Sequence, residues 1–457
     1  MKKLLSLIVF INSIASAQYL VKGTMTPPEK SNWVMLHKLQ GIKPKYIANT
    51  TIKVDTIKVG ADTKILGRFS FELASNALPG VYRITYRTKN AGFVDFIFNK
   101  ENIELIFNPQ YPEQSKVFTS SRENKLYSEY LDTYDKVQKK ITKCQAEYIK
   151  NPLKELRRTY KKTLGELKNI QSEFEHKSQG MFANSLIKAS QRFNSPKIID
   201  NMAEYLSETA DNFFKYIDFD DDILYNSSFL IDKVNDFVFY LNYSDDQFAQ
   251  QKLYKKSIER VMSIVSKHKI NKDVTEFLIS SFTNKRNSEI VDWLFSQYYD
   301  KLSNKNNAFK QKHLDELSVS VSRVAPDFSW NEKGIELKLS ELNDGANYLL
   351  VFWSTGCMHC VKEIPKVHEL TKRFPAISVI SFAIEDNKTE FDKFKDRLGR
   401  WHNAVGTHPT YKFDNEVVKK YKISATPTYF VLSQDKKIIA IPNSFEDLGK
   451  FLNKLKK

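Results

Sequence analysis

One stretch of the chain reads Val351-Phe352-Trp353-Ser354-Thr355-Gly356-Cys357-Met358-His359-Cys360-Val361-Lys362-Glu363-Ile364-Pro365. The apolar run 348–353 predicts a buried β-strand, and the Ser-Thr-Gly that follows it predicts a turn. A helix is expected next, with Cys357 and Cys360 in its first turn and on one face, because residues three apart are neighbours on a helix. Two cysteines in this context indicate a dithiol active site.

The positions of the two cysteines predict different roles. A thiol at a helix N-terminus lies near the positive end of the helix dipole and near unpaired N–H groups, which favour its thiolate form. Cys357 is therefore the predicted nucleophile. Cys360, one turn deeper, is predicted to resolve the mixed disulfide by attacking back. The redox-active Cys357–Cys360 pair is itself the reacting group, so no further cofactor is expected.

A Cys-x-x-Cys pair also supplies half of a zinc site, which is the first alternative. Such a site needs two further Cys or His ligands, usually as a second closely spaced pair. The remaining cysteine, Cys144, lies far upstream, and His402 and His408 stand alone among polar neighbours. The sequence therefore predicts no metal site.

The residues that follow predict the rest of an α/β domain. Residues 377–384 indicate a strand, 388–398 a helix, 429–432 with 437–441 a hairpin, and 445–455 a closing helix. Ala425-Thr426-Pro427-Thr428 places a proline at the entrance of the hairpin, where a missing N–H is tolerated. A cis Thr426-Pro427 bond, lying beside the cysteines, is predicted.

These motifs resemble a thioredoxin-fold domain of the TlpA/ResA type, from about Arg323 to the C-terminus. The resemblance implies a thiol-disulfide oxidoreductase in which Trp353, Thr426 and Pro427 contact the substrate. That family usually carries Trp directly before the first cysteine, and this chain has Gly356 there, so a smaller hydrophobic platform is expected beside the nucleophile. The matching segments are Ala325-Pro326-Asp327-Phe328, Phe352-Trp353, Cys357-Met358-His359-Cys360, Glu363 with Pro365, and Thr426-Pro427.

Glu363 is predicted to take part in proton transfer. It lies three residues after Cys360 on the same helix face, where its carboxylate could accept the thiol proton directly or through water. ResA-like proteins carry a glutamate at this place, so the resemblance implies the same role. The alternative is a surface glutamate that forms ion pairs with Lys362 or Lys366.

His359 is expected to oppose Glu363. A histidine just before the second cysteine resembles oxidising and isomerising relatives, in which it stabilises the thiolate and favours the reduced form. The negative charge of Glu363 should disfavour that thiolate. An intermediate to low reduction potential, and hence a reductase, is predicted, with an oxidase or isomerase as the alternative.

The first 17 residues predict a signal peptide: a positive start, an apolar run and a closing Ala15-Ser16-Ala17. The apolar run is too short to span a bilayer, no later stretch is long and apolar enough to do so, and no cysteine follows to accept a lipid. A periplasmic protein that is not membrane-spanning is expected. Its expected partners are disulfide-containing exported proteins and an upstream membrane electron donor.

The formal net charge of +16 comes from lysines scattered along the whole chain. A nucleic-acid or anionic membrane surface is one interpretation of such a charge. No binding motif accompanies it, so a solvated surface is the preferred interpretation and no nucleic acid partner is expected.

Residues 18–112 predict an antiparallel β-sandwich-like domain or small barrel. Alternating runs such as 68–72, 82–86 and 93–98 are separated by Gly, Pro and Asn turns. This part resembles the N-terminal β domain of undefined function that precedes thioredoxin-like domains in exported Bacteroidetes proteins. Its aromatic residues are expected to form a core rather than a ligand site.

Residues 113–318 predict an all-α region. One seam of apolar residues includes Cys144, which is expected to be a buried small hydrophobe, with a third redox thiol as the alternative. Asn151-Pro152 is expected to cap and start the next helix, which either pairs with the first as an antiparallel hairpin or stacks end to end. Asp218 to Asp222 suggest a calcium loop, but Ile223 and Phe229 occupy the places that need Gly and Glu, so helix capping is preferred. The seam is Tyr130, Tyr134, Val137, Ile141, Cys144 and Tyr148.

The sequence thus predicts an exported oxidoreductase with a thioredoxin-like domain at 319–457. One alternative is a non-catalytic assembly or binding protein that uses the same module as a platform. Another is a peroxidase of the peroxiredoxin type, although the proline expected near Thr355 in such enzymes is missing. The last is copper handling by Cys357, Cys360 and a distant histidine.

Overall fold

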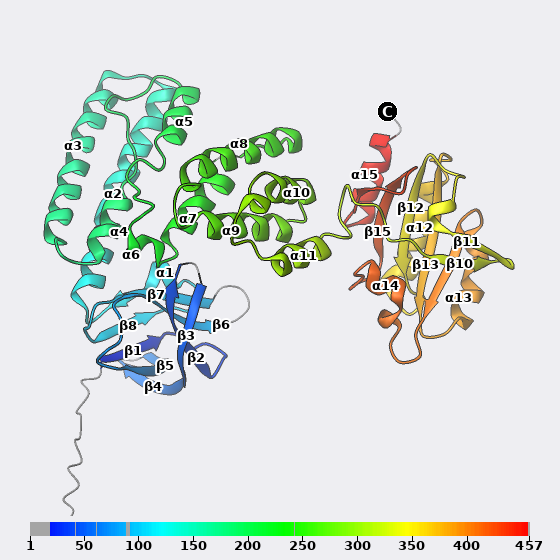
Figure 1. Ribbon diagram of the computed structural model, residues 1–457, viewed down its shortest axis with the longest axis horizontal. Coiled ribbons are helices and arrows are strands. Elements are labelled where there is room, and N and C mark those ends of the chain that lie inside the picture. Colours follow the sequence, from blue (N-terminus) through cyan, green and yellow to red (C-terminus); the bar gives the residue numbers. More distant parts are fainter. Residues whose placement is uncertain (1–18, 42, 61, 88–91, 242, 456–457) are drawn as a thin grey trace, which may run out of the picture. The chain divides into compact units, whose positions relative to one another are not determined.

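The computed structural model describes residues 19–41, 43–60, 62–87, 92–241 and 243–455. They form a β region, a helical region and a C-terminal α/β region, which confirms the predicted multidomain fold class (Figure 1). The predicted signal peptide at 1–17 lies outside the described residues. Among the helices of the described ranges, none combines the length and apolar character that a membrane crossing requires.

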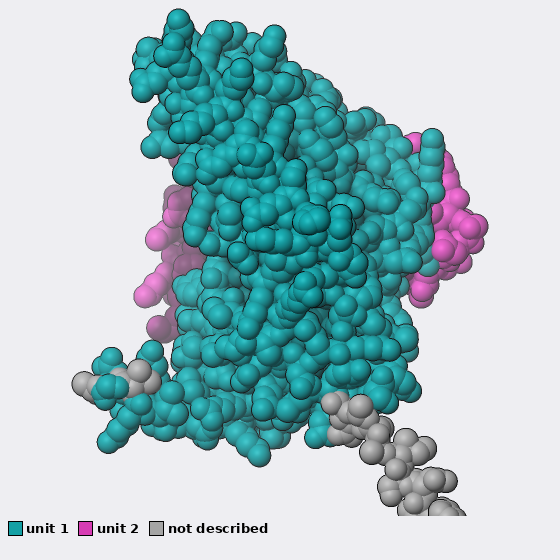
Figure 2. Space-filling model, turned by 90° about the vertical axis from the view of Figure 1, so that its left-hand side faces the viewer, with its two compact units in different colours: residues 1–274 teal, residues 275–457 magenta. Residues whose placement is uncertain are grey.

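The chain divides into two compact units, residues 1–274 and 275–457 (Figure 2). This division falls within helix α9 (Asn271–Asn284), so the last helices of the helical region belong to the same unit as the α/β region. The finer predicted boundaries at 112/113 and 318/319 stay predictions.

The β region consists of two sheets that share one core. Side chains from both sheets, among them Phe71, Tyr82, Phe96 and Phe107, are buried in it. The first sheet has the order β4 (Lys53–Val59), β5 (Asp62–Leu73), β1 (Tyr19–Met25), β8 (Ile103–Phe107) and β9 (Val117–Phe118). The second has the order β3 (Lys43–Thr51), β2 (Trp33–Gln40), β6 (Gly80–Arg87) and β7 (Gly92–Phe98).

The prediction of an antiparallel domain needs one correction. β1 and β8 run parallel, although the other strand pairs of the two sheets are antiparallel. Between β1 and β8 the chain passes through strands β2 to β7 of both sheets, and a connection of that length allows the two strands to run parallel.

The helical region begins with a long hairpin. Helices α2 (Arg122–Lys150) and α3 (Lys154–Lys177) pack antiparallel, with the Tyr130 hydroxyl donating to Gln171 Oε1 at 2.8 Å. The predicted seam of α2 is buried. Shorter helices follow: α4 (Ala183–Ala189), α5 (Met202–Asp211), α6 (Asp222–Tyr225), α7 (Phe229–Asn235), α8 (Gln247–Val265), α9, α10 (Ser288–Gln297) and α11 (Asn307–Glu316), with α1 (Pro112–Ser115) ahead of the hairpin.

Of the helix caps predicted from the sequence, one is wrong and one is confirmed. The predicted start of α3 at Asn151-Pro152 is wrong, because the Asn151 N–H still donates to the Glu147 carbonyl and ends α2. The carboxylate of Asp221 accepts hydrogen bonds from the Ile223 and Leu224 N–H groups, which confirms a capping role for this aspartate.

Cys144 is buried between α2 and α3. Its Sγ lies 3.2 Å from the carbonyl oxygen of Leu156, and burial raises the pKa of its thiol. A thiol in this environment resists ionisation, so the structure favours the small buried hydrophobe over a third redox thiol.

The α/β region is built on a sheet of order β14 (His402–Thr407), β13 (Ile377–Glu385), β12 (Asn347–Trp353), β15 (Thr428–Ser433) and β16 (Ile438–Ala440). The central strand β12 runs parallel to β13 and antiparallel to β15. Outside this sheet lie α12 (Met358–Thr371), α13 (Thr389–Phe394), α14 (Glu416–Lys420), α15 (Phe445–Leu455) and a hairpin of β10 (Ser329–Glu332) and β11 (Ile335–Lys338).

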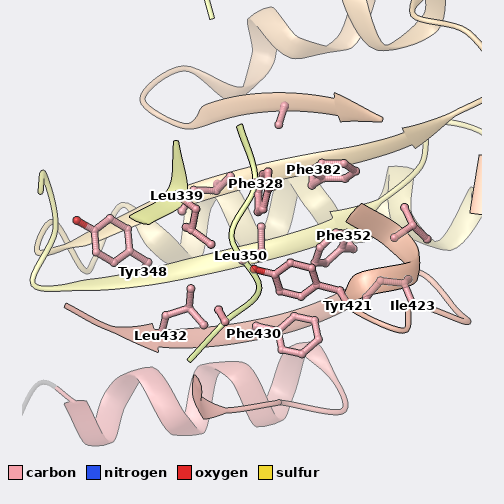
Figure 3. Close-up of a cluster of buried hydrophobic side chains, with 14 of the residues drawn as sticks. Phe328, Leu339, Tyr348, Leu350, Phe352, Phe382, Tyr421, Ile423, Phe430 and Leu432 are labelled. Carbon is pink, nitrogen blue, oxygen red and sulfur yellow. The ribbon is translucent and has the colours of Figure 1, made fainter. Parts of the chain in front are cut away.

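Successive residues of β12 enter two different cores. Tyr348, Leu350 and Phe352 lie in the core shown in Figure 3, together with Phe328, Phe382 and Tyr421. Leu349, Val351 and Trp353 lie in a second core, with residues of α12 and α15. All six side chains from 348 to 353 are fully buried, which confirms the predicted buried strand.

Candidate active site

Helix α12 begins directly after the turn that follows β12. Cys357 is its N-cap residue, one position before the predicted first turn, and its Sγ accepts a hydrogen bond from the Cys360 N–H at 3.2 Å. The Cys357 N–H donates to the Ser354 carbonyl at 3.1 Å. Cys357 and Cys360 form a disulfide, with their Cα atoms 5.2 Å apart.

The two cysteines differ in accessibility. Cys360 is fully buried in the second core, close to Val351 and Ile364, whereas Cys357 is half-buried at the surface. An incoming sulfur atom can therefore reach Cys357 but not Cys360.

The segment 425–428 lies beside the disulfide. The Thr426-Pro427 bond is cis, as predicted, and the Thr426 carbonyl oxygen is 3.6 Å from Cys357 Sγ. Thr426 and Pro427 are half-buried, so both have surface next to the accessible cysteine. Their geometry leaves them available to contact a substrate.

Glu363 points into the domain. Its side chain is only 14% exposed, and its two oxygens have different partners. The Tyr429 hydroxyl donates to Oε1, and His359 Nε2, on a side chain that is 70% exposed, lies 3.1 Å from Oε2. No ion pair joins Glu363 to Lys362 or Lys366 in the described part of the chain, so the surface-glutamate alternative is not supported.

Tyr429 was not recognised from the sequence. It lies on β15 opposite Val351, and its ring is buried in the same core as Cys360. Burial and the hydrogen bond to the Glu363 carboxylate raise the pKa of Tyr429 far above its usual value. The hydroxyl therefore remains a hydrogen-bond donor that holds Glu363 on the buried side of α12.

The prediction that Trp353 contacts substrate is wrong. Its side chain is fully buried, its Nε1 donates to Ser381 Oγ at 2.7 Å, and its ring packs against Phe394. Side chains alternate across a strand, so Trp353 enters the second core while its neighbour Phe352 enters the first. Trp353 supports the strand that carries the active-site turn.

Two polar side chains hold this turn, and neither was predicted from the sequence. Glu385, buried at the end of β13, accepts hydrogen bonds from the Thr355 N–H at 2.6 Å and the Thr355 hydroxyl at 2.9 Å. Lys412 donates to Ser354 Oγ at 3.1 Å. An acidic residue at the carboxyl end of a buried strand was the one sequence feature that pointed to Glu385.

Gly356 leaves room for Lys412. A Cβ atom at position 356 would lie 3.4 Å from Lys412 Nζ, and this ammonium also lies 3.5 Å from Asp386. The place next to the nucleophile, where a tryptophan was expected from the resemblance, thus borders a cationic side chain.

His402 does not stand alone, in contrast to the sequence-based interpretation. It begins β14, with Nδ1 2.9 Å from Glu332 and Nε2 2.8 Å from Asp344. His402 begins β14, Asp344 precedes β12 and Glu332 ends β10, whereas the cysteines follow the carboxyl end of β12. Across the described ranges, no group of three or more His, Cys, Asp and Glu side chains is arranged to hold a metal ion.

We expect His402 to make the stability of this domain depend on pH. Burial alone would lower the pKa of His402, but the hydrogen bonds to Asp344 and Glu332 raise it overall. A raised pKa adds stability that is fully present below the unfolded-state pKa of about 6.5 and is lost as the pH rises through the folded-state value. The free energy of unfolding should therefore fall above neutral pH.

The measurement is denaturant unfolding of the parent and of His402→Gln between mildly acidic and alkaline pH. The variant should show a smaller loss of stability as the pH rises. His408→Gln serves as the control, because His408 forms no ion pair among the described residues and should leave the parent's pH profile unchanged. An unaltered profile in His402→Gln would contradict the assignment.

The C-terminal region of the chain is similar to known proteins. Residues 321–441 match the model of the AhpC/TSA family. The thiol-disulfide oxidoreductase ResA of Geobacillus kaustophilus is 27% identical over 148 residues, which cover 31% of this chain and 82% of that protein. ResA of Bacillus subtilis is 26% identical over 127 residues, covering 27% of this chain and 68% of the relative.

Solved structures also resemble parts of this chain. The thioredoxin domain of a thiol-disulfide oxidoreductase from Bacteroides vulgatus is 21% identical, with a TM-score of 0.27, and the match covers 31% of this chain and 100% of that domain. A thioredoxin-like protein from Bacteroides caccae is 12% identical, with a TM-score of 0.29, and covers 57% of this chain and 97% of its own. The expected resemblance to TlpA/ResA-type proteins is confirmed by the family match and the ResA relatives.

Proposed function

We propose that this chain, whose C-terminal region is a thioredoxin-like domain of the AhpC/TSA family related to ResA, is an exported thiol-disulfide oxidoreductase that reduces protein disulfides. One observation carries the proposal. A half-buried cysteine at the N-cap of α12 is joined to a fully buried cysteine one turn further on, beside the Thr426-Pro427 segment.

The reaction begins with the reduced dithiol. The Cys357 thiolate attacks one sulfur of the substrate disulfide, so that a Cys357–substrate bond forms and the other substrate sulfur leaves as a thiolate. Cys360 then loses its proton and attacks Cys357 Sγ, which forms the Cys357–Cys360 disulfide and releases the second substrate sulfur. Two electrons have passed to the substrate, and a dithiol donor must return them.

Local hydrogen bonds favour this order of attack. The Cys360 N–H points to Cys357 Sγ and would stabilise a thiolate there, as N-terminal N–H groups of a helix do. Thr426 and Pro427 offer main chain next to this sulfur, where an extended substrate can pair in β fashion.

Glu363 is the proposed acceptor of the Cys360 proton. It lies one turn after Cys360 in a largely buried place, held there by the Tyr429 hydroxyl. A carboxylate in this position disfavours a thiolate at Cys360 and can take up its proton during attack. His359 Nε2 lies 3.1 Å from the same carboxylate, so this side chain is directed to Glu363 rather than to the cysteines. This arrangement supports the reductase direction.

We expect Glu363→Gln to slow disulfide reduction about 100-fold at neutral pH, the lower end of the effect of a positioned base. Tyr429→Phe should have a smaller effect in the same direction, because Glu363 remains but loses the hydroxyl that holds it. The measurement is the single-turnover rate of reduction against pH, with thiol titration of each variant. Glu369→Gln, on the exposed part of the same helix, is the matched control.

If Glu363→Gln leaves both the pH profile of the rate and the thiol titration unchanged, Glu363 does not accept the Cys360 proton.

The direction of electron flow is tested by the reduction potential of the Cys357–Cys360 pair. A value near that of thioredoxin, about −270 mV, supports the reductase, and a value near −120 mV, as in strong oxidants, overturns it in favour of an oxidase or isomerase.

Export remains part of the proposal. The charged start, apolar run and Ala15-Ser16-Ala17 support cleavage before Gln18 and a periplasmic location, where disulfide-containing exported proteins and a membrane electron donor would be the partners. N-terminal sequencing of the protein from its host should begin near Gln18. An intact N-terminus in a cytoplasmic fraction would refute export.

A peroxidase is the second candidate, because the matched family model is that of AhpC/TSA. Such an enzyme needs a cysteine that peroxide oxidises, and Cys357 is accessible enough to serve. Turnover of hydrogen peroxide that exceeds turnover of a disulfide protein would favour it. Failure of both reactions would favour the non-catalytic binding protein, and copper titration of the reduced protein tests the remaining alternative.

A further inference from the structure

The first unit contains a wide groove far along the chain from the cysteines. It has a volume of about 980 Å³ and is lined by α2, α7, the edge strand β9 and the segment that follows α4. Its walls include exposed apolar side chains: Val117 is 59% exposed and Leu131 39% exposed. The volume lies at the upper end of the range of small-molecule sites and suits an extended ligand.

Three cations that line this groove, Lys125, Arg192 and Lys233, form no ion pair among the described residues. Among the described residues, the side chains of Arg192 and Lys233 form no ion pair and no hydrogen bond, and Lys233 packs near the ring of Phe229, 5.4 Å from its centroid. Burial lowers the pKa of Lys233, and the nearby charge of Arg192 lowers it further. Lys233 is half-buried and Arg192 is exposed, and two neighbouring positive charges attract an anion to the space between them.

Most acidic groups of the groove are already neutralised. The ion pairs are Lys116–Glu113 at 2.7 Å, Lys136–Asp132 at 2.6 Å and Lys139–Asp135 at 2.6 Å. Two lining carboxylates, Glu129 on α2 and Asp232 next to Lys233, form no ion pair among the described residues, and both are exposed. Three cations without an ion pair thus face two such carboxylates, so the unpaired charge of the groove is positive.

The groove also borders main chain. Among the described residues, β9 is the last strand of its sheet and pairs with β8 alone. An edge strand offers N–H and C=O groups to an incoming extended chain. Its Val117 side chain is exposed beside that edge.

We infer that this groove binds an extended polypeptide segment that carries acidic and apolar side chains. The acidic side chains pair with Arg192 and Lys233, the apolar ones cover Val117 and Leu131, and the main chain continues the sheet at β9. A polypeptide is favoured over other polyanions because the walls are apolar and the paired carboxylates line the same groove. The site is independent of the dithiol reaction.

The test uses the full chain and a fluorescein-labelled, cysteine-free peptide in which glutamate and leucine alternate, followed by fluorescence anisotropy. The peptide should bind, and Arg192→Gln/Lys233→Gln should weaken binding at least about 10-fold, as expected for the loss of two charge pairs. Leu131→Ser should weaken it by a smaller factor. Lys161→Gln/Lys162→Gln, two exposed lysines of α3 outside the groove, should leave binding unchanged.

Thermal unfolding of every variant establishes that each one is folded. The inference is overturned if the peptide does not bind, if the α3 control weakens binding as much as the groove variant, or if a lysine-leucine peptide binds equally well. It is also overturned if heparin or single-stranded DNA binds more tightly than the peptide with the same dependence on Arg192 and Lys233, since the groove would then be a general polyanion site.

Discussion

A Cys360→Ser variant is expected to accumulate as a covalent complex with its disulfide substrates, whereas Cys357→Ser should lose disulfide reduction down to the background rate. The accessible Cys357 still attacks the substrate in the first variant, but no second thiol resolves the mixed disulfide. In the second variant the remaining thiol, Cys360, is enclosed by the core and cannot be reached.

The complexes are measured by non-reducing electrophoresis and mass spectrometry after incubation with a disulfide protein. The mass of the trapped species should equal the sum of both proteins, with the linkage at Cys357. Cys144→Ser in the Cys360→Ser background is the matched control and should trap as efficiently, because the Cys144 thiol is buried between α2 and α3. Equal trapping by Cys357→Ser would reverse the assigned roles.

Trp353→Ala should have the largest effect on stability, with a loss of about 3–5 kcal/mol in the free energy of unfolding of the C-terminal region, as for other buried tryptophans. The fully buried ring packs against Phe391 and Phe394, and its removal leaves a cavity next to the central strand. Ser381→Ala should cost less, about 1–3 kcal/mol, because it leaves the buried Trp353 N–H without its acceptor.

The measurement is denaturant unfolding combined with hydrogen exchange of the β12 amides, which isolates the C-terminal region from the rest of the chain. Tyr411→Ala is the control, since this aromatic side chain is largely exposed in the same region and should change stability by less than about 0.5 kcal/mol. A small stability loss for Trp353→Ala, together with strongly weakened substrate pairing, would restore the substrate-contact role.

The parts of the fold that depend on local pattern could be predicted. The run 348–353 is apolar at every position and is the buried central strand, and the closing helix has the expected bounds Phe445–Leu455. The cis bond at Thr426-Pro427 also followed from its place at a strand entrance. In each case the sequence pattern that predicts the structure lies within a few consecutive residues.

Contacts between distant segments could not be predicted in the same way. Thr355 and Glu385 are far apart in the sequence, as are Ser354 and Lys412, and only the parallel packing of β12 and β13 brings the first pair together. Strand β14 was missed because its sequence is polar and lies at the sheet edge, where burial does not impose an apolar pattern.

The side of the sheet that the Trp353 side chain enters could not be predicted from the sequence for another reason. A strand buried on both faces is apolar at every position, so its sequence does not tell which face each residue takes or which residue reaches the surface. Glu363 was assigned to the correct helix face. Its partner Tyr429 lies on β15, far from α12 in the sequence, so this contact could be identified only from the structure.

The close approach of Lys412 to Gly356 makes these two positions interdependent during sequence divergence. An alanine at 356 fits, since its Cβ would lie 3.4 Å from the ammonium, but a bulky side chain there has to share that space with Lys412. The tryptophan of related proteins therefore cannot be introduced at 356 as an isolated change without cost. A lineage that acquired a tryptophan there would be expected to exchange Lys412 for a shorter residue at about the same time, because the effects of contacting positions do not add.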